Sequence, residues 1–239
     1  MTKKPALLLL PNLLGNHKHH EIFLPPSVDR AVASIDGLIA ESAGEGRRYL
    51  GRFQTDKPAH NIPLALYNKK TPVEEIDFLL DPIRQGERWG YVVDAGLPCI
   101  SDPGSQLVHR ARKLGIAVQA FTGPSSVMYA LMLSGLNSQK FTFHGYLDRD
   151  SQPLKSDLQR LERLEGVQVF IEAPHRNRQL LETAMETLKD STVLCAAWDL
   201  TMPTQGIFCE KVSTWKKSPL PNLDKKPTIF LISSDSKAF

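Results

Sequence analysis

Residues 94–104 concentrate residue types that can hold a ligand. They read Asp-Ala-Gly-Leu-Pro-Cys-Ile-Ser-Asp-Pro-Gly and lie between a predicted strand, Arg88–Asp94, and a predicted helix, Ser105–Leu114. Open α/β sheets bind ligands beyond the carboxyl ends of their strands, which is where this segment is expected. Its glycines and prolines fix an irregular backbone whose amides and carbonyls can face a ligand. Asp94 and Asp102 add acceptors that suit ribose hydroxyls or a cationic group.

The plainer interpretation of this segment is a tight turn, in which Asp102 caps the helix and Pro103 takes its first position. Two further loops also follow predicted strands. They are Pro11–Asn16 and Thr122–Ser126, and the serines of the second are equally suited to capping a helix. None of the three is a Rossmann GxGxxG or a P-loop. Three loops at strand ends in one half of the chain predict one shared cleft.

Such loops need an α/β frame, and the pattern of apolar runs predicts one. Strands are expected at Pro5–Leu10, Ser34–Ala40, Arg88–Asp94, Ile116–Phe121, Phe141–Leu147, Val167–Ala173, Thr192–Asp199, Gly206–Val212 and Thr228–Ser233. Helical spacing predicts helices at Pro72–Gly86, Ser105–Leu114, Pro124–Ser134, Leu154–Leu164 and Leu180–Leu188. Strands and helices alternate in the first half, which predicts a parallel sheet, whereas the last three strands predict a mixed one. We expect two α/β domains, residues 1–122 and 123–239.

The composition excludes several classes of protein. With 41% hydrophobic and 23% charged residues, wholesale disorder is not expected. A net charge of +3 is too small for a nucleic-acid coat protein, although a local basic patch is compatible with it. The three cysteines form no CxxC pair, which suits a reducing compartment. The longest nearly pure apolar run, Ala6–Leu10, is far shorter than the roughly 20 residues of a membrane helix. We therefore expect a cytoplasmic protein without membrane contact.

Three other groups of residues invite a chemical interpretation. The histidines at 17, 19 and 20 resemble metal ligands, but they stand in a polar segment without ligand spacing, so a solvated loop is favoured over a metal site. A basic stretch contains Arg47, Arg48, Arg52, Lys57, Lys69 and Lys70, and Lys216–Lys217 and Lys225–Lys226 add to it if the fold brings them together. A solvated face is the favoured interpretation of this stretch, and contact with phosphates is the alternative.

Glu172, His175 and Arg176 suit either general-base catalysis or an ordinary helical turn that begins at Pro174, and both interpretations stay open. Cys99 has no neighbour in sequence that would lower the pKa of its thiol, so we expect it to be inert.

The order of several motifs along the chain resembles the tetrapyrrole methylase superfamily. Within it, the chain is most similar to the branch of bacterial methyltransferases that modify a cytidine 2′-hydroxyl of small-subunit ribosomal RNA. The matching motifs are Leu10-Pro11, Gly15-Asn16, Leu38–Glu41, Asp94–Gly104, Gly123-Pro124 and Phe170–Arg176. The version of residues 94–104 found here is quite specific to that branch, whereas the other motifs would be weak singly.

This resemblance implies S-adenosylmethionine (SAM) bound in a cleft between two α/β domains, a ribosomal RNA or small-subunit substrate, and a homodimer. The residues it implies for SAM binding are Pro11, Asp94, Gly96, Pro98, Ile100, Ser101, Gly104, Gly123, Leu131, Leu200 and Thr201. A ribose hydroxyl needs a base or strong acceptor close by, and the candidates are Asp102, Glu41 and Asp199, without rank. Bulky replacements of Gly96 or Gly104 are expected to abolish SAM binding in a folded protein.

The chain also departs from that branch. Ser42-Ala43-Gly44 replaces an Asp-Thr-Arg stretch after Glu41, and Trp198–Met202 replaces an Arg-Glu-Leu-Thr-Lys pattern. Val93 and Leu97 replace a serine and a threonine beside Asp94. These changes affect substrate identity more than SAM binding. Two alternatives to the RNA methyltransferase therefore stay open: a methylase of a small tetrapyrrole, and a SAM-binding module that has lost catalysis.

Overall fold

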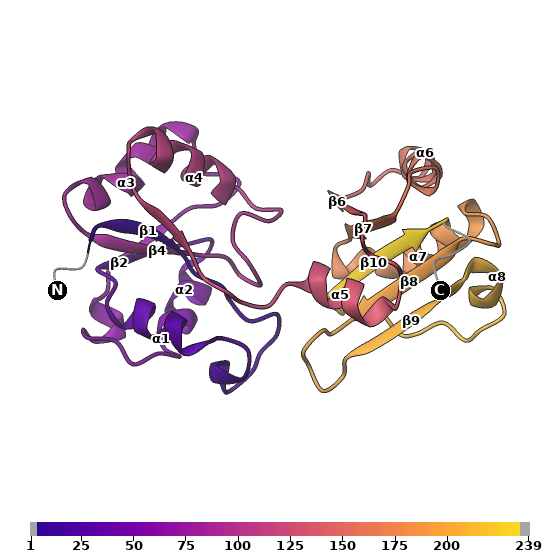
Figure 1. Ribbon diagram of the computed structural model, residues 1–239, viewed down its shortest axis with the longest axis horizontal. Helices are drawn as coiled ribbons and strands as arrows, with labels where there is room; N and C mark the ends of the chain where they lie inside the picture. The colour runs from indigo at the N-terminus through magenta and orange to yellow at the C-terminus, as the bar shows by residue number, and fades with distance from the viewer. Residues whose placement is uncertain (1–3, 235–239) are drawn as a thin grey trace. The chain divides into compact units, whose positions relative to one another are not determined.

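A computed structural model of the chain describes residues 4–234. It divides into two compact units, residues 1–125 and 126–239 (Figure 1). The domain boundary expected from the sequence, after residue 122, falls three residues before this division. Each unit is built on its own five-stranded sheet.

The first unit contains an all-parallel sheet, as the alternating pattern predicts. Its strand order is β3-β2-β4-β1-β5. The strands are β1 (Ala6–Leu9), β2 (Gly37–Ala40), β3 (Leu64–Leu66), β4 (Arg88–Val92) and β5 (Val118–Ala120). The helices are α1 (Pro26–Ala33), α2 (Ala43–Leu50), α3 (Ile76–Arg84) and α4 (Gly104–Lys113). Short 3₁₀ turns lie at His20–Ile22, Ala59–Asn61 and Val73–Glu75.

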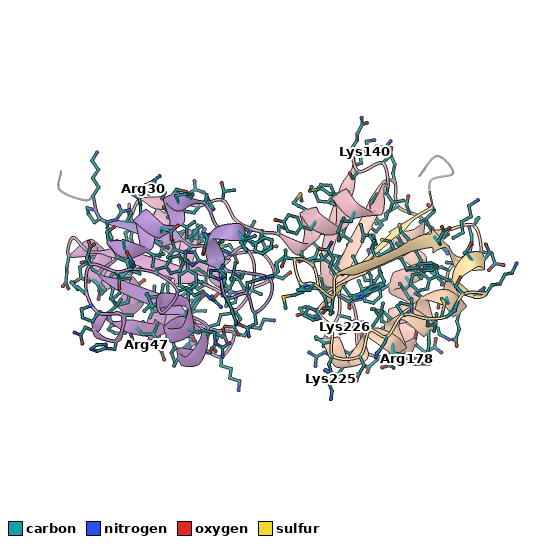
Figure 2. All side chains as sticks on the ribbon, turned by 90° about the horizontal axis from the view of Figure 1, so that it is seen from below. Arg30, Arg47, Lys140, Arg178, Lys225 and Lys226 are labelled. Atoms are coloured by element: carbon teal, nitrogen blue, oxygen red, sulfur yellow. The ribbon has the colours of Figure 1, made fainter. Side chains whose placement is uncertain are left out.

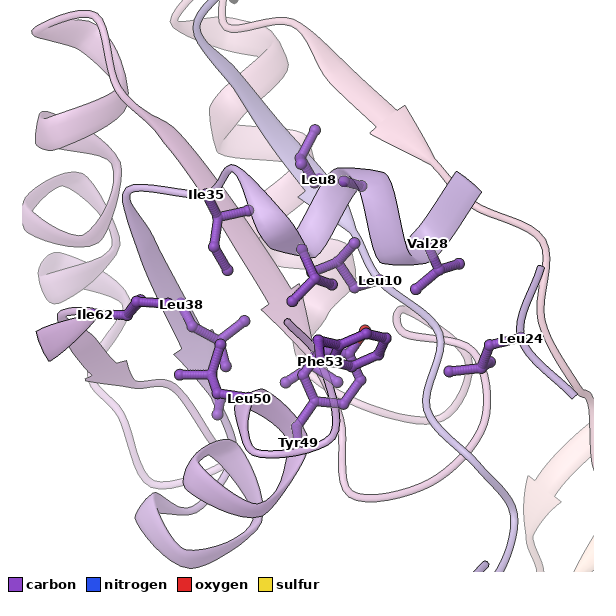
Figure 3. Close-up of a cluster of buried hydrophobic side chains, with 14 of the residues drawn as sticks. Leu8, Leu10, Leu24, Val28, Ile35, Leu38, Tyr49, Leu50, Phe53 and Ile62 are labelled. Carbon is purple, nitrogen blue, oxygen red and sulfur yellow. The ribbon is translucent and has the colours of Figure 1, made fainter. Parts of the chain in front are cut away.

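Both faces of this sheet are buried, because alternate residues of each strand point to opposite sides. On one face Leu8, Leu10 and Leu38 pack with side chains of α1 and α2, including Val28 and Tyr49 (Figure 3). On the other face the strand residues Leu7, Ile39 and Tyr91 pack with side chains of α3 and α4. This two-sided packing explains why the central strands read as nearly continuous apolar runs.

The second unit contains the expected mixed sheet, in the order β6-β7-β10-β8-β9. β6 pairs with β7 in parallel, and the remaining neighbours are antiparallel. The strands are β6 (Phe141–Tyr146), β7 (Val167–Ile171), β8 (Val193–Trp198), β9 (Gly206–Lys211) and β10 (Thr228–Ser233). The helices are α5 (Ser126–Ser134), α6 (Ser151–Glu162), α7 (Asn177–Thr187) and α8 (Val212–Trp215), with a 3₁₀ turn at Pro174–Arg176.

Helices cover the second sheet as well. Leucines of α6 and α7 pack with Phe170 and Phe230 of the central strands and with Trp215 of α8. α5 packs against β8, β9 and β10. The loop expected at Pro219–Lys226 is found between α8 and β10.

Several elements differ from the sequence predictions. The sequence pattern misses α1, α2 and β3, which have eight, eight and three residues and therefore little periodicity to detect. α3 begins at Ile76 rather than Pro72, because Val73–Glu75 form a 3₁₀ turn first. The expected helix at Pro124 begins at Ser126, and it ends before Gly135, whose φ of +68° is a left-handed conformation that favours glycine.

Candidate functional site

The topology of the first sheet defines one edge where a ligand site is expected. β1 and β4 are neighbours, but the chain leaves β1 toward β2 on one side and leaves β4 toward β5 on the other. Adjacent strands whose connections run in opposite directions form a topological switch point, and α/β proteins bind ligands beyond the carboxyl ends of such strands. The loops that follow β1 and β4 are the Pro11 loop (residues 10–16) and the Asp94 loop (residues 93–104), so two of the predicted segments meet here.

Asn12 holds these two loops together. Its backbone N–H donates to the carbonyl of Gly96 at 2.9 Å. Its side-chain amide donates to the carbonyls of Val93 at 2.9 Å and Asp94 at 3.0 Å. The amide oxygen accepts from the Leu13 N–H and from the Arg52 guanidinium, each at 2.8 Å. Asn12 is only 2% exposed, so its polar atoms depend entirely on these partners.

Asn12 was not among the predicted site residues, although it lies inside a predicted loop. Replacing it, Asn12→Ala, leaves two carbonyls, one N–H and a half-buried guanidinium without a partner. We expect the free energy of unfolding to fall by about 2–3 kcal/mol. Urea denaturation measures this, and Asn61→Ala, at an exposed asparagine of the 3₁₀ turn Ala59–Asn61, is the control. Equal stability of the two variants would contradict the role given to Asn12.

Glu41 joins the same edge from the end of β2. One of its carboxylate oxygens accepts the Asp94 N–H at 3.1 Å. Burial raises the pKa of this carboxyl, and the nearby charges of Asp94 and Asp102 raise it further, against the hydrogen bond from Asp94, which lowers it. A carboxylate with a raised pKa is a better proton acceptor than an ordinary one. Glu41 is therefore the best-prepared base among the three candidates.

Asp102 has a positioning role in the structure. Its Oδ1 accepts the Gly104 N–H at 2.7 Å and the Tyr91 hydroxyl at 2.8 Å. Its Oδ2 is buried and has no hydrogen-bond partner among residues 4–234. The expected capping pattern is wrong by one residue: α4 begins at Gly104, so Pro103 is the N-cap residue and not the first helical residue. Asp102 still satisfies the first N–H of the helix from one position further back.

The backbone of the Asp94 loop adopts uncommon conformations. Gly96, Cys99 and Ser101 have φ values of +74°, +70° and +68°. Left-handed conformations of non-glycine residues cost energy and occur often at functional sites, where the fold enforces them. In the same loop Pro98 is buried, whereas Ile100 and Ser101 are exposed. The alternation presents Ile100 and Ser101 to solvent at the switch-point edge.

The third predicted loop lies against the first. A Cβ atom at Gly123 would stand 2.1 Å from the Cβ atom of Pro11, so glycine allows this close approach. Gly123 follows β5, the other neighbour of β1. The structure thus brings the first-unit residues of the predicted SAM site to one edge of the sheet. They are Pro11, Asp94, Gly96, Pro98, Ile100, Ser101, Gly104 and Gly123.

The remaining predicted residues belong to the second unit. Asp199, Leu200 and Thr201 follow β8, and Leu131 is a buried residue of α5. Asp199 and Thr201 have φ values of +49° and +75°, so this loop also has a strained backbone. The Asp199 carboxylate pairs with Lys226 at 3.3 Å and accepts the Thr204 hydroxyl at 2.9 Å. These partners favour a structural role for Asp199 over that of a base.

The histidine segment is not a uniformly solvated loop. His20 contacts the Asp29 carboxylate at 2.7 Å and packs on the ring of Phe53 at 4.4 Å between centroids, with its side chain 12% exposed. His19 is exposed and contacts Glu21. Within the described part of the chain, no cluster of three His, Cys, Asp or Glu residues is arranged to hold a metal ion. The expectation of a solvated loop is therefore wrong for His20.

Several members of the basic stretch have partners within the first unit. Arg47 donates to the carbonyls of Ala59 and Ile62 and so holds a loop (Figure 2). Arg48 pairs with Glu45, and Lys57 pairs with Asp36. These three side chains are exposed, as the favoured interpretation of a solvated face predicts, but each also has a partner within the protein. The pairs Lys216–Lys217 and Lys225–Lys226 belong to the second unit, where the carbonyl of Lys226 accepts from Asn177 of α7, next to Arg178 (Figure 2).

Glu172 has a structural role, and Cys99 has the properties of an inert thiol. Glu172 is 6% exposed, accepts the Ala173 N–H at 2.6 Å and pairs with Arg176 at 3.2 Å, beside a 3₁₀ turn that begins at Pro174. Burial raises the pKa of the Cys99 thiol to about 12, and the charge of Asp102 adds to the effect. Such a thiol is almost entirely protonated at neutral pH, as expected of an inert cysteine.

Comparisons with known proteins define the class of this fold and site. The model of the family of tetrapyrrole (corrin/porphyrin) methylases matches residues 28–214, and the chain belongs to this family. The expected family and the expected methyltransferase class are thereby confirmed. Among residues 4–234, no helix has the length and apolar character needed to cross a membrane.

Two relatives are named ribosomal RNA small subunit methyltransferase I. The one from Vibrio cholerae is 30% identical over 217 residues, which cover 88% of this chain and 71% of the relative. The one from Bacillus subtilis is 30% identical over 190 residues, which cover 78% of this chain and 61% of the relative. The chain therefore spans about three fifths to seven tenths of the length of these two proteins.

A solved structure supports the fold. The uroporphyrin-III C-methyltransferase of Thermus thermophilus, determined in complex with S-adenosyl homocysteine, has a TM-score of 0.59 with 13% sequence identity. The match covers 95% of this chain and 97% of that one. At this identity the likeness concerns the fold alone. The expected arrangement of one parallel and one mixed sheet is confirmed by the strand pairing of this chain.

Proposed function

We propose that this protein is a SAM-dependent methyltransferase that modifies a ribose 2′-hydroxyl of small-subunit ribosomal RNA. One observation carries the proposal of catalysis: the Glu41 carboxylate, with its raised pKa, is hydrogen-bonded to the Asp94 loop at the switch-point edge. The ribosomal RNA substrate is supported by the similarity to ribosomal RNA small subunit methyltransferases I. Membership of the methylase family supports the cofactor.

The residues at this edge suit SAM. The cofactor supplies a methyl group on a positively charged sulfonium, which is a good leaving group. The carboxylates of Glu41, Asp94 and Asp102 provide a negative environment that attracts such a cation. The buried, unpartnered Oδ2 of Asp102 is an acceptor that a ligand donor would satisfy. The eight first-unit residues named above, Pro11 and Gly123 among them, would hold the cofactor. In the second unit, Leu131, Leu200 and Thr201 would add contacts.

The chain has two tasks in the reaction. The first is positioning, because holding an acceptor oxygen near the donor carbon removes several kcal/mol from the barrier. The hydrogen bonds of Asn12 and the strained backbone of the Asp94 loop make this edge rigid. The second task is proton removal, because a ribose hydroxyl is a poor nucleophile while it keeps its proton. Glu41 accepts that proton. Asp102 and Asp199 instead stabilise their own loops through hydrogen bonds and an ion pair.

Two further properties belong to the proposal. We expect the protein to form a homodimer and to work in the cytoplasm, where its RNA substrate is found. Light scattering of the purified chain tests the first property, and fractionation of cells that produce it tests the second.

The decisive test is transfer of labelled methyl from SAM to small ribosomal subunits taken from cells that lack this protein. A tetrapyrrole precursor is supplied in a parallel reaction. We expect label in the RNA, at a ribose, at a rate at least about a hundredfold above that with the Glu41→Gln variant. Label in the tetrapyrrole alone would replace the proposal with a tetrapyrrole methylase. Bound SAM without transfer to either would leave a module without catalysis.

A further inference from the structure

The turn that follows β3 is attached to the candidate site. It consists of Tyr67–Thr71, and Tyr67 is 1% exposed. The Tyr67 hydroxyl donates to the carbonyl of Pro103 in the Asp94 loop at 3.1 Å. The side-chain amide of Asn68 donates to the carbonyl of Glu41 at 3.2 Å. These two hydrogen bonds fix the position of the turn relative to Glu41 and to the Asp94 loop.

Internal hydrogen bonds also make the turn rigid. The Asn68 N–H donates to the Thr71 hydroxyl and the Lys70 N–H donates to the Asn68 side chain, each at 3.0 Å. The Thr71 N–H donates to the Asn68 carbonyl at 2.9 Å. Lys69 and Lys70 lie at the tip of this turn and are exposed. Their backbone is thus preorganised, so only side-chain freedom is lost when a ligand binds.

The acidic side chains at the switch-point edge would repel RNA unless nearby lysines offset their charge. Beyond the effect of burial, the charges of Asp94 and Asp102 both act on Glu41 and raise its pKa, so these three carboxylates form one acidic region. This region attracts a cationic cofactor but repels the phosphates of RNA. Arg47, Arg48 and Lys57 of the basic stretch are engaged with structural partners. Lys69 is close enough to Glu41 for its charge to lower the pKa of that carboxyl.

Lys70 has no carboxylate partner among the described residues. The ion pairs within residues 4–234 do not include it, although they engage Lys57, Lys216 and Lys226 of the basic segments. An exposed cation on a rigid turn beside the candidate base is suited to contact the polyanionic backbone of the nucleic acid that presents the reacting nucleotide.

We propose that Lys69 and Lys70 form a phosphate-binding turn that holds the RNA backbone next to the reacting ribose. The inference rests on the proposed function and names residues for its substrate. The two lysines offset the acidic region locally, and the hydrogen bonds of Tyr67 and Asn68 couple the position of the RNA strand to Glu41. Phosphate contacts of this kind position a substrate without reading its sequence.

The test compares the double variant Lys69→Ala/Lys70→Ala with the wild type in binding to unmodified small-subunit ribosomal RNA at several salt concentrations. We expect the slope of log K against log salt to become shallower by about 1.4, because each lost contact to a single strand removes about 0.7. At physiological salt the affinity for RNA should fall on the order of tenfold. The dissociation constant for SAM should not change, and Lys69→Arg/Lys70→Arg should retain the wild-type slope.

The matched control is Lys216→Ala/Lys217→Ala, which removes an adjacent pair of lysines with the same change of charge. Lys216 pairs with Asp190, which precedes β8 and so lies at the opposite end of that strand from Asp199. The inference is overturned if the Lys69/Lys70 variant keeps the slope and affinity of a wild type that binds and methylates RNA. If the wild type itself neither binds nor methylates RNA, the proposed function fails and the inference fails with it.

Discussion

Glu41→Gln should lower the rate of methyl transfer to RNA in a single turnover by about 10²- to 10⁴-fold, while SAM binding and the fold are kept. Glutamine has nearly the same shape, and its amide oxygen can still accept the Asp94 N–H that the carboxylate accepts at 3.1 Å. It cannot take a proton from the ribose hydroxyl. The loss therefore isolates proton removal from positioning, and rapid quench with labelled SAM measures it.

The control for this variant is Glu45→Gln. Glu45 lies four residues further on, in the first turn of α2, and pairs with Arg48. It carries the same charge but makes no hydrogen bond to the Asp94 loop among the described contacts, so its loss should change the rate less than threefold. If Glu41→Gln retained the wild-type rate, Glu41 would not be the base, and Asp102 would be the next residue to replace.

The dependence on pH has a defined sign. A base works when it is unprotonated, so the rate should rise with pH through the pKa of Glu41, which burial and the neighbouring Asp94 and Asp102 place above the ordinary value for glutamate. The same shift affects stability. The folded state binds the Glu41 proton more tightly than the unfolded chain does, so this group's contribution to stability falls as pH rises from the unfolded to the folded pKa. Both effects should disappear in Glu41→Gln.

The sequence predicts much of this fold because the strands are strongly patterned. Both faces of the first sheet are covered, so runs such as Ala6–Leu10 are apolar throughout and are easily recognised. α1 and α2 are only eight residues long, and they bury a few side chains such as Val28 and Tyr49, so their periodicity is too short to detect. The sequence therefore predicts helices best where the amphipathic stretch is long.

The site is predictable to the level of loops and not to the level of contacts. The glycines, prolines and acids of residues 94–104 indicate an irregular ligand-binding segment from composition alone. The role of Asn12 depends on the register of β1 beside β4, which places its side chain against the carbonyls of Val93 and Asp94. No local pattern carries that information. The same holds for the Tyr67 hydroxyl, which reaches Pro103 from 36 residues away in the chain.

The structure also separates two glycines that the sequence treats alike. A Cβ atom at Gly104 would lie 2.3 Å from the Tyr91 ring and 2.7 Å from Asp102 Oδ1. A bulky residue there displaces a buried tyrosine and the first N–H of α4, so the expected variant is unstable rather than merely unable to bind SAM. At Gly96 the nearest atoms are Leu14 Cδ2 at 3.3 Å and the Pro124 carbonyl at 3.7 Å, which leaves room for a folded protein.

Gly96→Val should therefore weaken SAM binding by at least tenfold and lower the free energy of unfolding by about 2 kcal/mol. The φ of +74° disfavours any β-branched residue, and the added methyl groups push against Leu14 of the Pro11 loop and Pro124 of the β5 loop. All three loops at the switch-point edge then shift together. Calorimetric titration with SAM measures the affinity, and urea denaturation measures the stability.

Gly115→Val distinguishes a local effect from a general loss of stability. Gly115 has a φ of +71°, almost the same as that of Gly96, and nothing within 4 Å of an added Cβ atom. It lies between α4 and β5, at the amino end of that strand and hence at the opposite edge of the parallel sheet. The two valines should cost similar backbone strain, but only the one at Gly96 should weaken SAM binding. Equal affinities in the two variants would mean that the cofactor binds elsewhere, because the backbone strain is matched and only the valine at Gly96 pushes on the loops of the switch point.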